Sequence, residues 1–199
     1  MTRSPWERVL GAQIDQLDPA LRAYFGAIPR GSVGRGSGVF DAVGTPRRWL
    51  WPVLAVLALD GVLFPVWEKD ARLTIVNRPG PHGTIRSTRT FHLASGDRAM
   101  VDEIGIATNG LTDRLGRHGF IASALEARVV DAGVELRSTS AELRVGRLRV
   151  PLGVLSPRVI LSERTFGARQ RVSLRLELPI VGLLYEYSGL FDYAVEKES

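Results

Sequence analysis

The sequence predicts an α+β protein, mainly β, in which a curled antiparallel sheet forms a barrel or half-barrel covered by N-terminal helices. The first third of the chain has apolar residues at helical spacing, and the period changes to two from residue 63 onward. Eight or nine short strands with turn signals between them are typical of an antiparallel sheet that curls. We find no linker or internal repeat. We therefore expect one domain over 1–199, with helices at 4–28 and 46–59 and a sheet over 63–195.

Residues 4–28 are expected to form a helical hairpin or one bent helix. Ser4 and Pro5 give a start signal, because serine caps helix N-termini and proline fits the first turn. Apolar residues follow at helical spacing until Asp18 and Pro19 interrupt the helix before a second short piece. The two pieces would plug or cover the sheet.

A glycine-rich segment, "GSVGRGSG", follows at residues 31–38. It superficially resembles a phosphate-binding loop, but it lacks the GxxxxGK[ST] spacing of that loop. We interpret it as a mobile connection that leads to a short strand around Val39.

The most apolar stretch of the chain is "RRWLWPVLAVLALDGVLFPVW", residues 47–67, and its length is close to that of a membrane span. Pro52, Pro65 and the turn signal at Asp60 and Gly61 argue against a span. A carboxylate at mid-bilayer also costs roughly 2.5 to 3.5 kcal/mol on insertion scales. The segment therefore reads as part of a protein core.

We expect this segment to form the helix at 46–59, followed by a strand from about Leu63. A helix that lies on a membrane surface stays open as an alternative. Trp49 and Trp51, which sit beside two arginines, would make that peripheral contact.

Alternation of apolar and polar residues marks the strands. The segment "TIRSTRTFHL" places Arg89 and Phe91 on one face, and residues 98–107 and 121–130 are further strands. The segment "VVDAGVEL" predicts a hairpin with its turn at 131–133. The segment "QRVSLRLEL" predicts an antiparallel strand with one wet face.

Composition narrows the chemistry. The chain has no cysteine, which excludes disulfides, thiolate zinc sites and cysteine nucleophiles. His82, His92 and His118 form no metal-binding spacing, so we predict no metal site. The net charge of +5 comes mainly from arginines spread along the chain, and we expect no nucleic-acid partner. The first residues lack the apolar core of a secretory signal, so a cytoplasmic location is expected.

Charged residues on apolar strand faces mark the candidate site. Arg89 shares its face with Phe91, Glu163 lies on an apolar face of its own strand, and Glu103 lies beside Val101. A buried charge is unfavourable unless it is paired. These residues form either a structural ion pair or rim, or a cavity in which Arg89 and a carboxylate bind a polar head group or exchange protons.

The C-terminal segment "LLYEYSGLFDYA" places several aromatic side chains on one strand face. Such a row is typical of a core, but tyrosine hydroxyls need partners and also suit a pocket wall. The predicted ligand-binding residues are Arg89, Phe91, Glu163, Tyr185, Tyr187 and Phe191. The candidates for catalysis are Glu163, Glu103 and Arg89.

The run "LRVPLGVLSPRVILSERTFGARQRVSLRLELPIVGLLYEYSGLF" resembles the C-terminal signature of an uncharacterised bacterial family, catalogued as domain of unknown function 4166. The matching positions are Pro157, Glu163, Pro179, Gly182, Tyr187 and Gly189. "SPWERVLGAQIDQLDPALRA", "RTF" and "VDEIG" resemble upstream parts of the family pattern. Where the family often has a histidine, this chain has Tyr24 or Phe25.

The resemblance implies a possible partner, since family members commonly occur fused to, or encoded near, dinucleotide-dependent oxidoreductases. This chain has no Rossmann fingerprint, so we expect it to bind no nicotinamide and no other cofactor. Three hypotheses follow. The leading one is binding of a hydrophobic small molecule or lipid, with Arg89 meeting an anionic or carbonyl head. The others are a cofactor-independent isomerase or cyclase that uses the same cavity, and an interaction domain for an oxidoreductase through Trp49 and Trp51.

Overall fold

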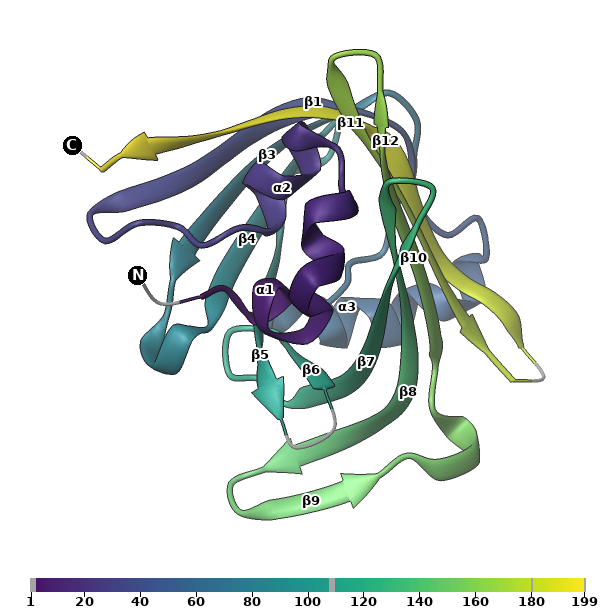
Figure 1. The fold of residues 1–199 in the computed structure, drawn as a ribbon. Coiled ribbons are helices and arrows are strands. Elements are labelled where there is room, and N and C mark those ends of the chain that lie inside the picture. Colours follow the sequence, from purple (N-terminus) through teal and green to yellow (C-terminus); the bar gives the residue numbers. More distant parts are fainter. Residues whose placement is uncertain (1–2, 108–109, 180, 199) are drawn as a thin grey trace.

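The computed structural model describes residues 3–107, 110–179 and 181–198. Its main element is a sheet of 12 strands (Figure 1). The strands are β1 Ser32–Gly44, β2 Trp67–Glu68, β3 Ala71–Pro79, β4 Ile85–Leu93, β5 Gly96–Ala107, β6 Gly110–Leu115, β7 Ile121–Val130, β8 Gly133–Val145, β9 Leu148–Pro151, β10 Arg158–Phe166, β11 Arg169–Leu178 and β12 Gly182–Lys197. The α-helices are α1 Pro5–Leu10, α2 Pro19–Phe25 and α3 Trp51–Leu59, with short 3-10 turns at Gly11–Gln16, Arg48–Leu50, Pro81–Gly83 and Gly153–Leu155.

Ten of the strands close into an antiparallel barrel, which confirms the predicted curled sheet. The strands follow one another around the barrel in chain order, apart from β2 and β9, and the barrel closes where β12 pairs with β1 and β8 pairs with β10. The β7–β8 hairpin is confirmed, with Asp131 and Ala132 both at positive φ in the turn. Because side chains alternate along each strand, one face of every strand points into the barrel.

Strand β1 corrects the interpretation of the glycine-rich segment as a mobile connection. This segment is the first half of a 13-residue strand, which pairs with β12 on one side and β3 on the other. A Cβ on Gly38 would collide with the Leu190 carbonyl oxygen and lie 2.6 Å from Cβ of Phe191, and one on Gly34 would collide with the hydroxyl of Tyr193. The glycines are therefore present because aromatic side chains of β12 occupy the space beside them.

The N-terminal helices span one end of the barrel, as predicted for residues 4–28. Helix α1 packs against β5, β6 and β7, whereas α2 packs against β10, β11 and β12 (Figure 1). Ser4 caps α1 by accepting a hydrogen bond from the Glu7 backbone N–H at 3.0 Å, and its hydroxyl donates to the Phe25 carbonyl at 2.6 Å. The Asp18 N–H donates to the Ala132 carbonyl at the β7–β8 turn. These bonds fix the helices across the barrel mouth.

Helix α3 covers the opposite end. It begins at Trp51 after a 3-10 turn, so the predicted helix at 46–59 is confirmed with a later α-helical start. The strand predicted from Leu63 is wrong, because residues 61–66 run irregularly under the barrel and the chain next pairs at β2. The sheet therefore extends over 32–197 instead of 63–195. Within the described residues no helix is long and apolar enough to cross a membrane.

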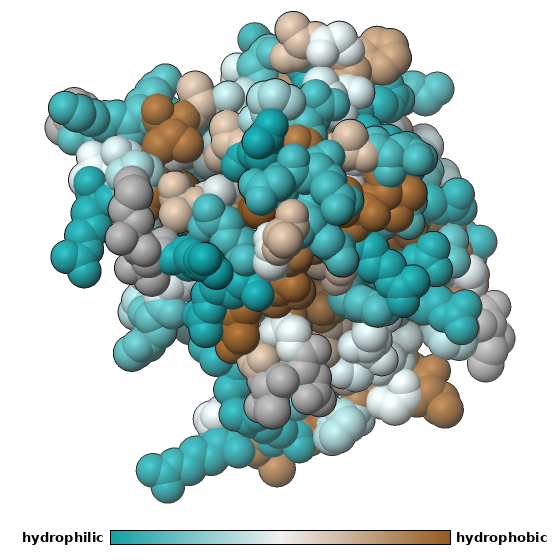
Figure 2. Space-filling model, in the orientation of Figure 1, coloured by the Kyte–Doolittle hydropathy of each residue, from teal (hydrophilic) through white to brown (hydrophobic). Residues whose placement is uncertain are grey.

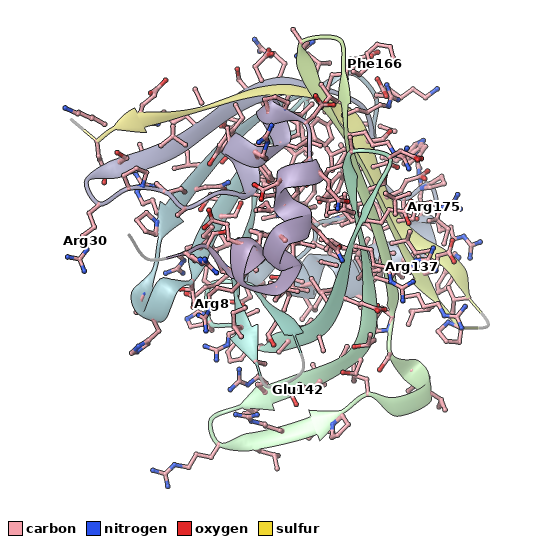
Figure 3. All side chains as sticks on the ribbon, in the orientation of Figure 1. Arg8, Arg30, Arg137, Glu142, Phe166 and Arg175 are labelled. Carbon is pink, nitrogen blue, oxygen red and sulfur yellow. The ribbon has the colours of Figure 1, made fainter. Side chains whose placement is uncertain are left out.

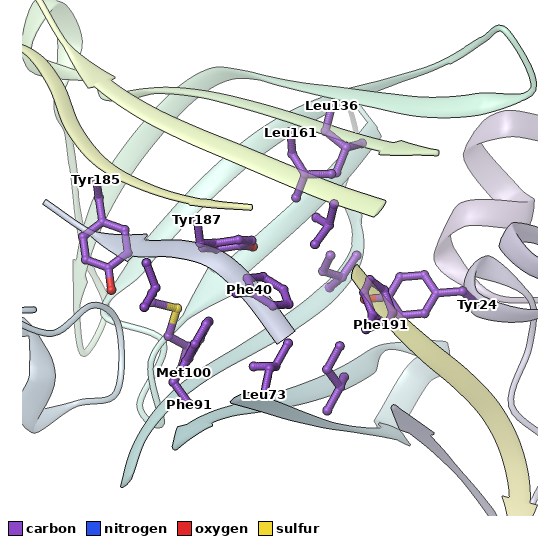
Figure 4. Packing of buried hydrophobic residues seen from close by; sticks show 14 of the residues in the cluster. Tyr24, Phe40, Leu73, Phe91, Met100, Leu136, Leu161, Tyr185, Tyr187 and Phe191 are labelled. Atoms are coloured by element: carbon purple, nitrogen blue, oxygen red, sulfur yellow. The ribbon is translucent and has the colours of Figure 1, made fainter. Parts of the chain in front are cut away.

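Aromatic side chains fill the barrel between β1, β4 and β12 (Figure 4). The ring of Phe40 lies 5.6 Å from that of Phe91 and 5.7 Å from that of Tyr187, and Phe64 lies 5.6 Å from Phe91. The two phenylalanine pairs meet edge to face, whereas Phe40 and Tyr187 are tilted at 52°. Edge-to-face aromatic contacts stabilise a core beyond simple burial. The visible outer surface is mostly hydrophilic (Figure 2), as expected for strands with one face in water.

Candidate functional site

A pocket of about 200 Å³ lies inside the barrel. It extends from Trp6 of α1 to Leu57 near the end of α3, so helices border it at both ends. Most of the side chains around it are apolar. The lining residues are Trp6, Tyr24, Leu57, Val62, Leu63, Asn77, Ile85, Ser87, Arg89, Met100, Val101, Asp102, Ile104, Asp113, Leu115, Ile121, Ser123, Leu125, Leu136, Ala141, Pro157, Val159, Leu161, Glu163, Leu174, Leu176, Leu184 and Tyr187.

The charged residues of this lining are exceptions in the molecule. Most charged side chains, such as Arg137 and Arg175, project from the outside of the barrel (Figure 3). By contrast, Arg89, Asp102, Asp113 and Glu163 come from the inward faces of β4, β5, β6 and β10. Four ionisable side chains from four strands therefore meet in one interior.

Arg89 and Asp102 form a buried ion pair. Arg89 Nη1 lies 2.5 Å from Asp102 Oδ1, and the two side chains are 18% and 3% exposed. Burial raises the pKa of Asp102, although the guanidinium opposes that shift. Burial alone would lower the pKa of Arg89, but Asp102 and the neighbouring tyrosines outweigh it and the pKa is raised. Arg89 therefore keeps its positive charge.

Two further carboxyl groups share the interior. Burial, and then the charge of Asp102, raises the pKa of Asp113 well above its ordinary value. Burial also raises the pKa of Glu163 from 4.5 to about 7, although Arg89 acts in the opposite direction. Near neutral pH, Glu163 is therefore close to half protonated.

Several oxygen atoms in this lining have no protein partner. They are side-chain atoms of buried residues, whereas buried polar groups in proteins nearly always form hydrogen bonds. Among the described residues the unpartnered atoms of the pocket lining are Asn77 Oδ1, Ser87 Oγ, Asp102 Oδ2, Asp113 Oδ1 and Glu163 Oε2. The pocket lining thus holds unused capacity for hydrogen bonds.

Tyrosines complete the polar part of the lining. Tyr187 lies across the barrel on β12, and burial raises its pKa to about 12. Tyr24 comes from α2, and burial followed by the charge of Glu163 raises its pKa well above the ordinary value. Both hydroxyls stay protonated near neutral pH, so each offers a neutral hydrogen-bonding group.

The predicted ligand-binding residues fall into two groups. Arg89, Glu163 and Tyr187 line the pocket together. The other three, Phe91, Tyr185 and Phe191, are fully buried core residues and are not part of the lining (Figure 4). Phe91 and Phe191 still contact the lining, because their rings lie 6.1 Å from Tyr187 and 5.6 Å from Tyr24.

The structure corrects the interpretation of Glu103, the third catalytic candidate, which the sequence analysis grouped with Arg89 and Glu163 as a charged residue on an apolar strand face. It lies on the outer face of β5, beside a separate pocket that includes Arg114 and Arg149. The sequence analysis also missed Asp102 and Asp113. A signal for both was present, because Asp102 alternates with Met100 and Ile104, and Asp113 alternates with Leu111 and Leu115.

The expected surface at Trp49 and Trp51 is only partly exposed. Trp49 is 63% exposed, but Trp51 is half-buried, and its indole N–H donates to the Thr45 carbonyl at 3.3 Å. The exposed apolar face of α3 consists of Val53, Val56 and Leu59, and Trp49 in the preceding 3-10 turn is exposed beside it in the sequence. Within the described ranges no group of three or more histidine and acidic side chains could hold a metal ion.

Fold and site together define an antiparallel β-barrel protein with an ionisable cluster in its interior. Residues 17–191 match the model of the family described as Domain of unknown function (DUF4166). The match covers most of the chain, so the protein belongs to this family. The comparisons found no match among curated proteins or among solved structures.

Proposed function

We propose that the protein binds a small, mostly apolar molecule inside the barrel, with the polar part of that molecule at the Arg89–Glu163 cluster. The observation that carries this proposal is the set of unpartnered buried oxygens around the pocket. An interior built only for stability is better served by well-packed apolar side chains than by buried charges. Buried charged groups that stability alone does not explain are typical of functional sites.

The size of the pocket favours a small molecule over a lipid. A cavity of roughly 150 Å³ is enough for benzene. The pocket of about 200 Å³ therefore suits a substituted ring or a short branched chain, and it is too small for a complete acyl chain. We accordingly narrow the sequence-based hypothesis from a hydrophobic small molecule or lipid to a ring-sized compound.

Native mass spectrometry tests the proposal directly. The purified protein is expected to carry added mass that is lost on denaturation, or to acquire it from a library of ring-sized compounds. The control variant is Ala141→Phe, which places a bulky side chain in the lining and should reduce binding while circular dichroism confirms its fold. Absence of bound mass in the wild-type protein, with no library compound binding at millimolar concentration, would contradict the proposal.

Proton transfer is a second candidate function, and one observation favours it. Glu163 has a pKa of about 7, which suits a general acid or base near neutral pH. Asp113, whose pKa is also raised by burial and by the charge of Asp102, would be the complementary acid. This arrangement supports a cofactor-independent isomerase or cyclase.

A pair of measurements on Glu163→Gln distinguishes the two candidates. If the protein is an enzyme, the Glu163→Gln variant should still bind the compound identified by mass spectrometry but should no longer convert it. A binding protein requires that the wild-type protein return this compound chemically unchanged after long incubation.

A further inference from the structure

The balance of charge in the pocket indicates which ligands it accepts. One guanidinium shares the interior with three carboxyl groups, and Asp102 already neutralises it at 2.5 Å. Among the described residues of the lining, Asp113 and Glu163 have no other cation. An anionic ligand would therefore meet an excess of carboxyl groups and a guanidinium that is already paired.

The hydrogen-bonding groups indicate the same preference. Among the described residues of the lining, every buried side-chain atom without a protein partner is an oxygen. The amide nitrogen of Asn77 already donates to the hydroxyl of Tyr193 at 3.3 Å, whereas its oxygen is unpartnered. An ionised carboxylate can only accept hydrogen bonds. Asn77 Oδ1 and the oxygens of an ionised carboxylate therefore need a donor from the ligand.

We propose that the ligand carries a protonated amine, whose N–H groups would donate to Glu163, Asp113 and the neighbouring unpartnered oxygens. This inference rests on the proposed binding function and specifies its ligand class. It replaces the expectation that Arg89 meets an anionic or carbonyl head. Arg89 has a positioning role, because its pairing with Asp102 holds that carboxylate in place.

The apolar part of the ligand would occupy the remaining lining. Leucines of β7, β8, β10 and β11 surround this part of the pocket, at Leu125, Leu136, Leu161 and Leu174. Burial of apolar surface contributes about 25 cal/mol per Å² to binding. The pocket thus combines an acidic end with an apolar wall, which is the arrangement that an apolar amine requires.

The experiment compares three probes with the same ring and different polar ends: 2-phenylethylamine, 2-phenylethanol and phenylacetate. Each is titrated by calorimetry or NMR into the full-length protein at pH 8, where the amine is protonated and Glu163 is mainly ionised. Removing one partner of a buried charge pair typically weakens binding by a factor of ten or more. We expect the amine to bind at least about tenfold more tightly than phenylacetate.

Variants locate the effect. Glu163→Gln is expected to weaken amine binding about tenfold, with little change for the alcohol, because only the amine loses a charge partner. Glu103→Gln removes the same charge from the outer face of β5, away from the interior, and should leave all three affinities unchanged. Thermal unfolding establishes that both variants are folded. If Glu163→Gln fails to fold, the ranking of the three probes on the wild-type protein still decides the question.

The outcomes separate the inference from the proposed function. Tightest binding by phenylacetate, or equal binding of amine and alcohol, would overturn the amine inference while the pocket remains a binding site. Failure of all three probes at millimolar concentration would contradict the proposed function and the inference with it. Selective amine binding that is lost in Glu163→Gln would establish both.

Discussion

Replacement of Glu163 by glutamine should make the protein more stable, and increasingly so as the pH rises. Glu163 is 5% exposed, and its pKa rises from 4.5 to about 7 on folding. Below pH 4.5 the group is protonated in both the folded and unfolded states. Between pH 4.5 and about 7 the unfolded chain releases the proton and the folded protein retains it, so the free energy of unfolding falls.

The magnitude follows from the same pKa values. A change of one in pKa corresponds to about 1.4 kcal/mol, so ionised Glu163 destabilises the folded protein by about 3 kcal/mol at pH 8. Glutamine has nearly the same shape and no charge to bury. The unfolded chain is already largely ionised at this position at pH 5, so the stability difference between Glu163→Gln and wild type should increase by about 2.5 kcal/mol between pH 5 and pH 8.

Urea unfolding of both proteins at several pH values measures this difference. Subtraction of the two curves removes the pH dependence that Asp102 and Asp113 contribute to both proteins. Glu103→Gln, on the outer face of β5, controls for removal of any glutamate. A difference that stays constant between pH 5 and pH 8 would refute the reasoning and show that Glu163 ionises as readily in the folded protein as in the unfolded chain.

Three other changes test the fold, the ion pair and the surface of α3. Arg89→Met should reduce the free energy of unfolding by about 3 to 5 kcal/mol, because Asp102 loses its partner. Adding Asp102→Asn should restore part of this loss. No recovery of stability in the double variant would mean that the two residues are not coupled. Gly38→Ala should destabilise the protein by about 1 to 3 kcal/mol in thermal unfolding, whereas the control Ser37→Ala should have little effect. A similar loss of stability in the two variants would contradict the close packing of β1 on β12. We also propose that the exposed apolar face of α3, preceded by two arginines, contacts an anionic lipid surface. Val56→Asp should then abolish cosedimentation of the protein with anionic vesicles. Retained cosedimentation of this variant would exclude the contact.

Local sequence patterns predicted most of the strands, because the alternation of apolar and polar residues shows which face of a strand is buried. The alternation that places Arg89 on an apolar face needs only the period of a strand, and the β7–β8 hairpin needs only its two-residue turn. The helix at α1 begins at Ser4 and Pro5, where a short-range capping signal lies. These features depend on residues within one or two turns of one another, so the sequence contains them in readable form.

Closure of the barrel could not be read in this way. It depends on β1, whose glycines have low strand propensity when considered alone. Their role becomes evident only beside β12, because Gly34 and Gly38 leave room for the bulky side chains at Tyr193 and Phe191. The reason for the glycines thus lies more than 150 residues away, and a reading of the local segment instead predicts a loop.

The surroundings of strand β5 explain why the sequence analysis selected Glu103 and missed Asp102. Val101 is 8% exposed although it alternates with the inward residue Met100, because the Gly61 carbonyl accepts its N–H and the chain before β2 covers it from outside. With both faces of the strand buried at this point, the apolar residue Val101 gave Glu103 the appearance of an inward position. Asp102, on the true inner face, looked like a solvent-exposed residue between two apolar ones. Alternation identifies faces only where one of them is wet, and the functional side of β5 becomes readable only when the segment that covers its other side is known.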